Sequence, residues 1–340
     1  MLNKKKHGRK VIGKRLHSTL EERSEKMKAE MERERADQEI YLESPHVEFL
    51  VPEIVNFVET EPVKDLKNRV LRWVKIGYPP HIVGPTGCGK TTLALAVAKE
   101  LGRPTLWLNG DDQMNTSDLV GGYSEFETSS VRDRYIHNVM KAKDRTRFTW
   151  VDNPLTIACK YGYTLIYNEF SRAKPIANNV LLSVLEEGIL ELPIMFGRQR
   201  YIKVNPDFKV IFTSNSIDYA GVHTPQDALL DRLVDIYMGF YDFDTEVKIV
   251  RKHTGLPDEE TENIVRTVRD IREAMPEVSK PSTRAAIMIG HALRATGNYS
   301  MEDLRQICYD VMASKIYGDE DQSKKESTID EVLTTIYSDL

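Results

Sequence analysis

Apolar residues along this chain of 340 residues fall first into short continuous runs and later into helical repeats. Four short runs, bounded by glycine, proline or polar residues, predict buried strands at residues 81–84, 105–109, 163–168 and 208–214. Helical patterns lie between them. Strands that alternate with helices are typical of an α/β fold, in which a parallel sheet carries helices on both faces.

After about residue 241 the pattern takes the helical period. Residues 260–275 and 301–312 each place apolar side chains on one helical face: Ile264, Val265, Val268 and Ile271 in the first, and Leu304, Ile307, Cys308, Val311 and Met312 in the second. Ser300 and Asp303 have the spacing of a capping box at the start of the second helix. No strand signal of similar quality follows, so a small helical domain is expected here.

The N-terminal region differs from the rest in charge. Residues 1–17 hold seven Lys or Arg and no acid, whereas the whole chain has a net charge of −5. Residues 18–43 are rich in charged helix formers and too poor in apolar residues to drive packing, so they form an exposed helix or stay flexible. We therefore divide the chain into an arm at 1–45, an α/β domain at 46–240 and a helical domain with a charged tail at 241–340. The arm either contacts an anionic partner or is a solvated tail.

Composition narrows the class of protein. Apolar residues make up 41% and charged residues 29%, and no run of 18 uncharged apolar residues occurs, which favours a soluble globular protein without a membrane span. The basic N-terminus lacks the apolar core of a secretory signal. The cysteines Cys88, Cys159 and Cys308 are odd in number and widely spaced, which fits reduced thiols in a cytosol.

The stretch GPTGCGKT at residues 84–91 fits the phosphate-binding pattern GxxxxGK[ST] at every fixed position. An apolar strand precedes it and the helical pattern TTLALAVAKEL follows it, as this motif requires. Free backbone N–H groups of such a loop bind anions. We predict that Lys90 reaches the β- and γ-phosphates and that the Thr91 hydroxyl binds Mg²⁺. The nucleotide-binding residues are Gly84, Pro85, Thr86, Gly87, Cys88, Gly89, Lys90, Thr91 and Thr92.

The ligand of this loop is predicted to be ATP by elimination, because no [NT]KxD segment that reads guanine follows the fourth strand. Cys88 lies inside the loop and is interpreted as a small filler rather than a redox sensor. Glu169 follows the apolar strand TLIY and is the candidate that orients a hydrolytic water. Asn215 ends the strand FKVIFTSN and is a candidate to hold the same water, although turns also favour asparagine.

The order of phosphate loop, strand ending in NE, strand ending in TSN, then ALLDRL and PSTRAA resembles AAA+ ATPases of the MoxR branch. Within that branch the chain is similar to the gas vesicle protein N family over about residues 50–295. The likeness is most specific in SDLVGGY, YIHNVMK, WVDNPLTIACKYGYTLIYNEFSRAKPIANNVLLSVLEEGILELP and IFTSNSIDYAGVHTPQDALLDRL.

The resemblance implies roles for further residues. Arg232 in LLDRL would be an arginine finger for the neighbouring subunit, Arg284 in PSTRAA a sensor on the helical lid, and Asn215 the first sensor. A finger supplied in trans implies a ring, most simply of six copies. Without the resemblance, both arginines read as solvated residues on helices.

Asn168 departs from the family pattern, which usually has aspartate immediately before the catalytic glutamate. Asparagine keeps one acceptor oxygen but lacks the charge, and its NH₂ group would have to point away from Mg²⁺. We therefore expect weaker Mg²⁺ binding or slower turnover.

The resemblance also supplies a purpose: assembly and enlargement of gas vesicles in the cytoplasm, as a chaperone acting on vesicle proteins. Tyr123 and Phe126 would grip a partner in the ring's pore or belong to the core. One alternative is a MoxR-type activator that inserts metal into a partner enzyme or remodels it. A DNA-remodelling ATPase is supported by the basic arm alone, since the chain shows no DNA-binding motif, so a nucleic-acid partner is not expected.

Overall fold

A computed structural model of the chain describes residues 51–52, 56–132, 142–193, 201–215, 223–275, 280–297, 300–316 and 322–337. The basic arm at 1–45 lies outside the described residues. None of the described helices has the length and apolar character that crossing a membrane requires.

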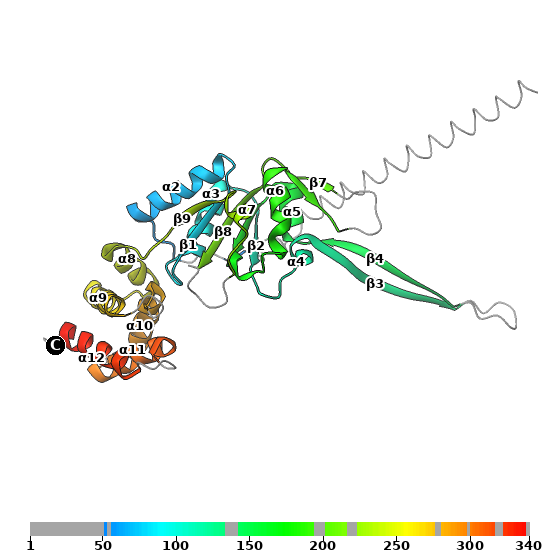
Figure 1. Cartoon of the computed structure of the whole chain (residues 1–340). Helices are drawn as coiled ribbons and strands as arrows, with labels where there is room; N and C mark the ends of the chain where they lie inside the picture. The colour runs from blue at the N-terminus through cyan, green and yellow to red at the C-terminus, as the bar shows by residue number, and fades with distance from the viewer. Residues whose placement is uncertain are drawn as a thin grey trace, which may run out of the picture. The chain divides into compact units, whose positions relative to one another are not determined.

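A five-stranded parallel sheet forms the centre of the α/β part, with strand order β2-β5-β8-β1-β9 (Figure 1). The strands are β1 Pro80–Gly84, β2 Thr105–Asn109, β5 Thr164–Asn168, β8 Lys209–Asn215 and β9 Val234–Tyr237. The four strands predicted from apolar runs are confirmed to within one residue at each end. Parallel pairing places their carboxyl ends at one edge of the sheet, where the phosphate loop and the predicted polar residues follow.

Strand β9 was not predicted, because it carries no apolar run. Of its four residues only Ile236 is buried, and its neighbours Asp235 and Tyr237 are exposed. Alternating buried and exposed residues are typical of a strand at the edge of a sheet. A pattern of only four residues, however, does not distinguish such a strand from a loop. The pairing of β9 with β1 therefore depends on the tertiary structure.

Helices pack on this sheet and connect its strands. Helix α2 Glu61–Lys75 packs against α3 Lys90–Leu101, and α3 contacts β1, β5 and β8. Helix α5 Pro154–Tyr161 packs on β2 and β5. Short elements complete this part: α4 Thr116–Val120, α6 Val180–Glu186, α7 Asp227–Leu230, the 3₁₀ turns Phe170–Arg172 and Ala177–Asn179, and the hairpin β6 Ile189–Glu191 with β7 Tyr201–Lys203.

Helical patterns are expected between β2 and β5, and α4 and α5 lie there, but the described residues between these two helices are not helical. The chain instead forms an antiparallel hairpin of β3 Gly121–Arg132 and β4 Ala142–Asp152, which run side by side in Figure 1. The pairing joins Gly121 to Asp152, and the register shifts between Glu125 and Glu127. Pairing of residues up to 31 positions apart is a non-local choice that a local periodicity does not contain.

Helices alone follow β9 in the described part of the chain: α8 Phe243–Thr254, α9 Asp258–Ala274, α10 Thr283–Thr296, α11 Met301–Ile316 and α12 Gln322–Tyr337. All five contribute to one hydrophobic cluster, which includes the predicted Ile264, Val265, Val268, Ile271, Leu304, Cys308 and Met312. The predicted capping box is also present, because the Ser300 backbone N–H donates to Asp303 Oδ2 at 2.8 Å and the Asp303 N–H to Ser300 Oγ at 3.2 Å. The helical character predicted from the apolar period is confirmed.

Candidate active site

The loop between β1 and α3 is shaped by glycines that no other residue replaces easily. Gly87 has φ of +77°, and a Cβ atom there would lie 2.4 Å from Ser282 Oγ, just before α10. Gly89 has φ of +103° and precedes the first residue of α3. Because a glycine has no side chain to cap the helix, the first N–H groups of α3 are available to an anion.

Lys90 is buried, with 5% of its surface exposed, and its ammonium has neutral partners. Nζ donates to the carbonyl oxygens of Gly84 at 3.0 Å and Pro85 at 2.8 Å, and to Asn215 Oδ1 at 2.9 Å. Burial lowers the pKa of this ammonium from its ordinary value. These described partners of Nζ are carbonyl and amide oxygens rather than carboxylates, so an anion bound by the loop would remove part of this desolvation cost.

Asn215 connects Lys90 to Glu169. Its Oδ1 accepts from Lys90, and its Nδ2 donates to Glu169 Oε2 at 2.8 Å. The two partners fix the orientation of the amide, because an ammonium only donates and a carboxylate only accepts. Three residues predicted from separate stretches of sequence therefore meet at the carboxyl edge of the sheet.

The backbone of Glu169 is held in a left-handed conformation, with φ of 53° and ψ of 38°. This conformation costs a non-glycine residue about 1–2 kcal/mol. The surrounding chain supports it: the Glu169 N–H faces Thr213 Oγ1 at 3.3 Å, and a Cβ atom at Gly110 would lie 2.1 Å from the Glu169 carbonyl oxygen. The strain redirects the chain at the end of β5, where the acidic side chain meets Asn215.

Asn168 joins β5 to its neighbours through neutral hydrogen bonds. Its Oδ1 accepts from the hydroxyls of Thr91 at 2.9 Å and Thr213 at 2.8 Å, and its Nδ2 donates to Asn109 Oδ1 at 2.9 Å. The amide oxygen therefore faces Thr91 and the NH₂ group faces β2. This is the orientation that a metal ligand at Asn168 requires.

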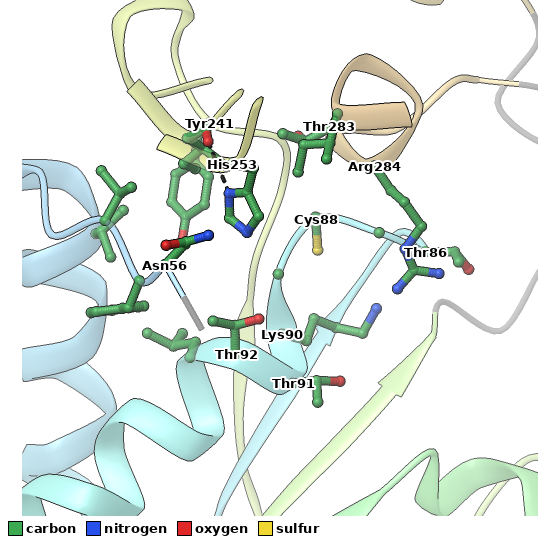
Figure 2. Close-up of a pocket in the computed structure, with 18 of the residues that line it drawn as sticks. Asn56, Thr86, Cys88, Lys90, Thr91, Thr92, Tyr241, His253, Thr283 and Arg284 are labelled. Atoms are coloured by element: carbon green, nitrogen blue, oxygen red, sulfur yellow. Dashed lines mark hydrogen bonds between the residues drawn. The ribbon is translucent and has the colours of Figure 1, made fainter. Parts of the chain in front are cut away.

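A cavity of about 280 Å³ opens beside these groups. From the sequence-predicted set it is lined by Thr86, Gly87, Cys88, Gly89, Lys90, Thr91, Thr92, Glu169, Asn215 and Arg284. Gly84 and Pro85 contribute through the carbonyl groups that hold Lys90. Figure 2 shows the Arg284 guanidinium reaching from α10 toward Thr86 and the Lys90 end of the cavity.

Arg284 lies near the start of α10. A buried network of charged side chains holds this end of the helix, and the sequence pattern did not predict it. Glu246 of α8 is 1% exposed. Its carboxylate accepts from Arg272 at 2.9 and 3.0 Å, from Arg269 at 2.8 Å and from the Thr283 hydroxyl at 2.6 Å. Nothing in the spacing of these residues marks them, because they come from three helices. Thr283 precedes Arg284, so the network fixes the backbone that presents this arginine.

Arg232 is not brought to the cavity of its own chain. It follows α7 and contacts the Glu186 carboxylate and the Ala228 carbonyl oxygen. About a quarter of its side chain, 27%, is exposed, and its buried Nε has no hydrogen-bond partner. The structure of one chain thus separates Arg232 from the other predicted residues.

The remaining predicted residues are Cys88, Tyr123 and Phe126. Cys88 is 2% exposed, and burial raises the pKa of its thiol, which lies 3.7 Å from the Met238 carbonyl oxygen. Tyr123 is 36% exposed and packs edge-on against Trp150, with ring centroids 5.3 Å apart. The side chain of Phe126 lies outside the described residues.

A second feature without a sequence signal is a Ser–His–Asp chain across three strands. His81 Nδ1 lies 2.7 Å from Asp235 Oδ1, and Nε2 lies 2.6 Å from Ser214 Oγ. Ser214 is 2% exposed and does not line the cavity, so it lacks the access that a nucleophile needs. The three residues instead tie β8, β1 and β9 together beside Asn215.

Comparison with known proteins places this chain in a family. The AAA domain of the dynein-related subfamily matches residues 81–233. The chain is 54% identical to the gas vesicle ATPase GvpN of Haloferax mediterranei over 85% of this chain and 82% of that protein. It is 52% identical to GvpN1 of Halobacterium salinarum, over 85% and 84% of the two chains, and 43% identical to GvpN of Ancylobacter aquaticus, over 77% and 74%.

The alignments with these relatives cover most of both chains, and their sequence identities are well above those of proteins that share only a fold. The resemblance inferred from the sequence and the predicted fold class are both confirmed. The chain belongs to the GvpN family of AAA+ ATPases.

Proposed function

We propose that this protein is a Mg²⁺-dependent ATPase that works as a ring, most simply a hexamer, and acts as a chaperone in gas vesicle assembly and enlargement. The observation that carries the ATPase part is the Asn215 amide, which joins the buried Lys90 ammonium to Glu169 beside the glycine-lined loop. The gas vesicle part is supported by the names of the relatives, several of which are gas vesicle ATPases.

In this proposal the loop N–H groups and Lys90 hold the phosphates of ATP, and Glu169 orients the attacking water. Asn215 holds Glu169 until the γ-phosphate is present and then senses it. Because the amide already bonds both Lys90 and Glu169, a change at the phosphate end alters the position of the carboxylate.

The donor set fits Mg²⁺. The Thr91 hydroxyl and Asn168 Oδ1 are hard oxygen ligands 2.9 Å apart. No cluster of three or more His, Cys, Asp or Glu side chains that would hold a metal occurs among the described residues, so phosphates and waters would complete the shell. Mg²⁺ neutralises charge on the phosphates when bound. With a neutral amide in place of a carboxylate, we expect weaker metal binding and slower turnover.

The two arginines would act from different chains. Arg284 lines the same cavity as Lys90 and would report the γ-phosphate to the helical part. Arg232 lies outside that cavity and is partly exposed, which supports a role as a finger in the neighbouring subunit. Its contact with Glu186 would then have to open when a ring forms.

The test measures ATP hydrolysis and particle mass, each with and without Mg²⁺ and ATP. Wild type is expected to hydrolyse ATP only with Mg²⁺ and to form larger particles with ATP. Arg232→Ala should keep ATP binding and lose about 10³-fold in kcat. Arg266→Ala on the exposed side of α9 is the matched control and should leave kcat unchanged. Hydrolysis by monomers that does not depend on Arg232 would refute the ring mechanism.

The gas vesicle role needs a cellular test. In a host that forms gas vesicles and lacks its own relative, wild type should restore wide vesicles in the cytoplasm, whereas Glu169→Gln should give few or narrow ones by electron microscopy. Normal vesicles without the protein would remove this role and favour an ATPase that activates a partner enzyme.

A further inference from the structure

The end of the cavity away from Lys90 has a different lining. Figure 2 places Asn56, Tyr241 and His253 on this side, with Tyr241 in the chain just before α8. The same cavity is also lined by apolar side chains from the chain before α2 and from α2, α8 and α10: Phe57, Val58, Val63, Ile249 and Ile287. None of these residues was singled out in the sequence. An apolar pocket with few polar groups fits a flat heteroaromatic ring, whose faces are apolar and whose edge carries hydrogen-bonding groups.

One polar group in this end has a fixed hydrogen-bonding character. His253 Nδ1 lies 2.9 Å from the Ile249 carbonyl oxygen, one turn earlier in α8. A carbonyl oxygen can only accept, so Nδ1 carries the hydrogen. In the neutral ring Nε2 is then a bare acceptor. Figure 2 shows the bonded nitrogen facing the ribbon and the other ring nitrogen facing the cavity.

The other two polar side chains at this end of the cavity, Asn56 and Tyr241, can each donate or accept a hydrogen bond. Asn56, which Figure 2 places on the same side as His253, carries both an acceptor oxygen and a donor NH₂ group and can turn its amide. The Tyr241 hydroxyl can rotate to donate or accept, and burial raises its pKa, so it stays neutral. His253 is therefore the group of the three that can tell a donor from an acceptor on a bound base.

We propose that His253 Nε2 accepts a hydrogen bond from the 6-amino group of adenine and thereby selects adenine over 6-oxopurines. The proposal rests on nucleotide binding by this cavity. A 6-oxo group would place two acceptors against each other, and neither would have a proton to share. A bound 6-oxopurine would thus lose one hydrogen bond and leave an acceptor unpaired, which amounts to about a tenfold or greater difference in affinity.

The experiment uses diphosphates, so that hydrolysis does not interfere, and the full chain in isothermal titration calorimetry. The probes are ADP, IDP, which has a 6-oxo group, and purine riboside diphosphate, which has no substituent at position 6. Wild type should bind ADP about tenfold tighter than IDP, with purine riboside diphosphate between them. His253→Phe keeps a flat ring but removes the acceptor, and should bring the ADP-to-IDP ratio close to one.

Three further variants make the outcome specific. His253→Gln, which keeps a polar side chain if the Phe variant does not fold, offers both a donor and an acceptor and should also lower the ratio to about one to two. Asn56→Ala should weaken ADP and IDP alike and leave the ratio near ten. Lys252→Ala, next to His253 but exposed and outside the cavity, should change neither affinity.

A wild-type ratio near one, or a tenfold ratio that survives in His253→Phe or His253→Gln, overturns the assignment of His253 while leaving nucleotide binding intact. If none of the three diphosphates binds to wild type, the nucleotide site itself is refuted, and so is the selection of adenine by His253.

Discussion

Two polar networks border the cavity, and they are made of different groups. At the strand ends, Asn168 joins Thr91, Asn109 and Thr213 through neutral amides and hydroxyls. At the start of α10, the carboxylate of Glu246 holds two guanidiniums and the Thr283 hydroxyl. The first network faces the place where a metal and phosphates would bind, and the second fixes the element that carries Arg284.

The difference in charge implies a difference in adaptability. The Glu246 and Arg272 side chains are 2% and 9% exposed, so their desolvation is offset only when every bond of the network is made. Neutral hydrogen bonds contribute about 1 kcal/mol each, and Asn109 can turn its amide to meet a changed partner. The charged network is thus suited to hold one arrangement, and the neutral one can rearrange when ligands bind.

The largest effect is expected from Glu246→Ala. It leaves the guanidiniums of Arg269 and Arg272 without their carboxylate, and the free energy of unfolding should fall by about 3–5 kcal/mol in urea titration. Glu259→Ala, an exposed acid in α9, is the control and should change it by less than about 0.5 kcal/mol. A loss below about 1 kcal/mol for Glu246→Ala would mean that the charged network is as adaptable as the neutral one.

Glu169→Gln should come next, with an effect on catalysis rather than on stability. An amide oxygen can still accept from Asn215, so the fold and ATP affinity should be kept, whereas kcat should fall by about 10²–10³-fold because the amide cannot polarise water. Steady-state hydrolysis and calorimetric binding of ATP separate the two. Normal turnover by this variant would assign the water to another group.

Asn168→Asp tests the neutral network directly and should have a smaller effect. A carboxylate beside Thr91 should raise Mg²⁺ affinity by about tenfold, measured from the Mg²⁺ dependence of ATP hydrolysis. Stability should change by no more than about 1 kcal/mol if the Asn109 amide turns to donate. Asn109→Ala is the control, because it removes the acceptor of the Asn168 NH₂ group and leaves the hydrogen bonds of the Asn168 oxygen in place. Unchanged Mg²⁺ dependence and kcat in Asn168→Asp would show that Asn168 does not face the metal.

The smallest effect is expected from Cys88→Ala, which changes a buried side chain that no network uses. Unfolding free energy at pH 7 should fall by about 1 kcal/mol, and ATP affinity should stay within twofold.

The same variant has a pH signature. Burial raises the pKa of the Cys88 thiol above its ordinary value of 9.0, so the folded state disfavours the thiolate. Below pH 9 the thiol is protonated in both the folded and the unfolded chain, so this group leaves the free energy of unfolding unchanged. Above pH 9 the thiol of the unfolded chain ionises first, and the free energy of unfolding falls as pH rises. Cys88→Ala should therefore lose less stability than wild type between pH 8 and pH 10 in urea titrations. An equal loss in both proteins would place Cys88 in a more polar environment than the structure does.

Much of the site was predictable because its residues stand at marked positions. Lys90 and Thr91 are part of a motif, and Glu169 and Asn215 follow apolar strands that had to be buried. Neighbouring parallel strands end at one edge, so these residues were expected to lie together. Glu246, Arg272 and His253 have no such marker, since a charged or polar residue on an amphipathic helix looks the same whether it faces water or a partner.

The sequence by itself determined the parallel sheet, the phosphate loop and the helical C-terminal part, because local apolar periods and fixed motif spacings depend on near neighbours along the chain. The tertiary structure alone decided the left-handed turn at Glu169, the direction of the Asn168 amide, the pairing of β9 and of the β3–β4 hairpin, and the buried carboxylate behind Arg284. Each of these depends on contacts between residues that are far apart in the sequence, and such contacts produce no periodic pattern along the chain.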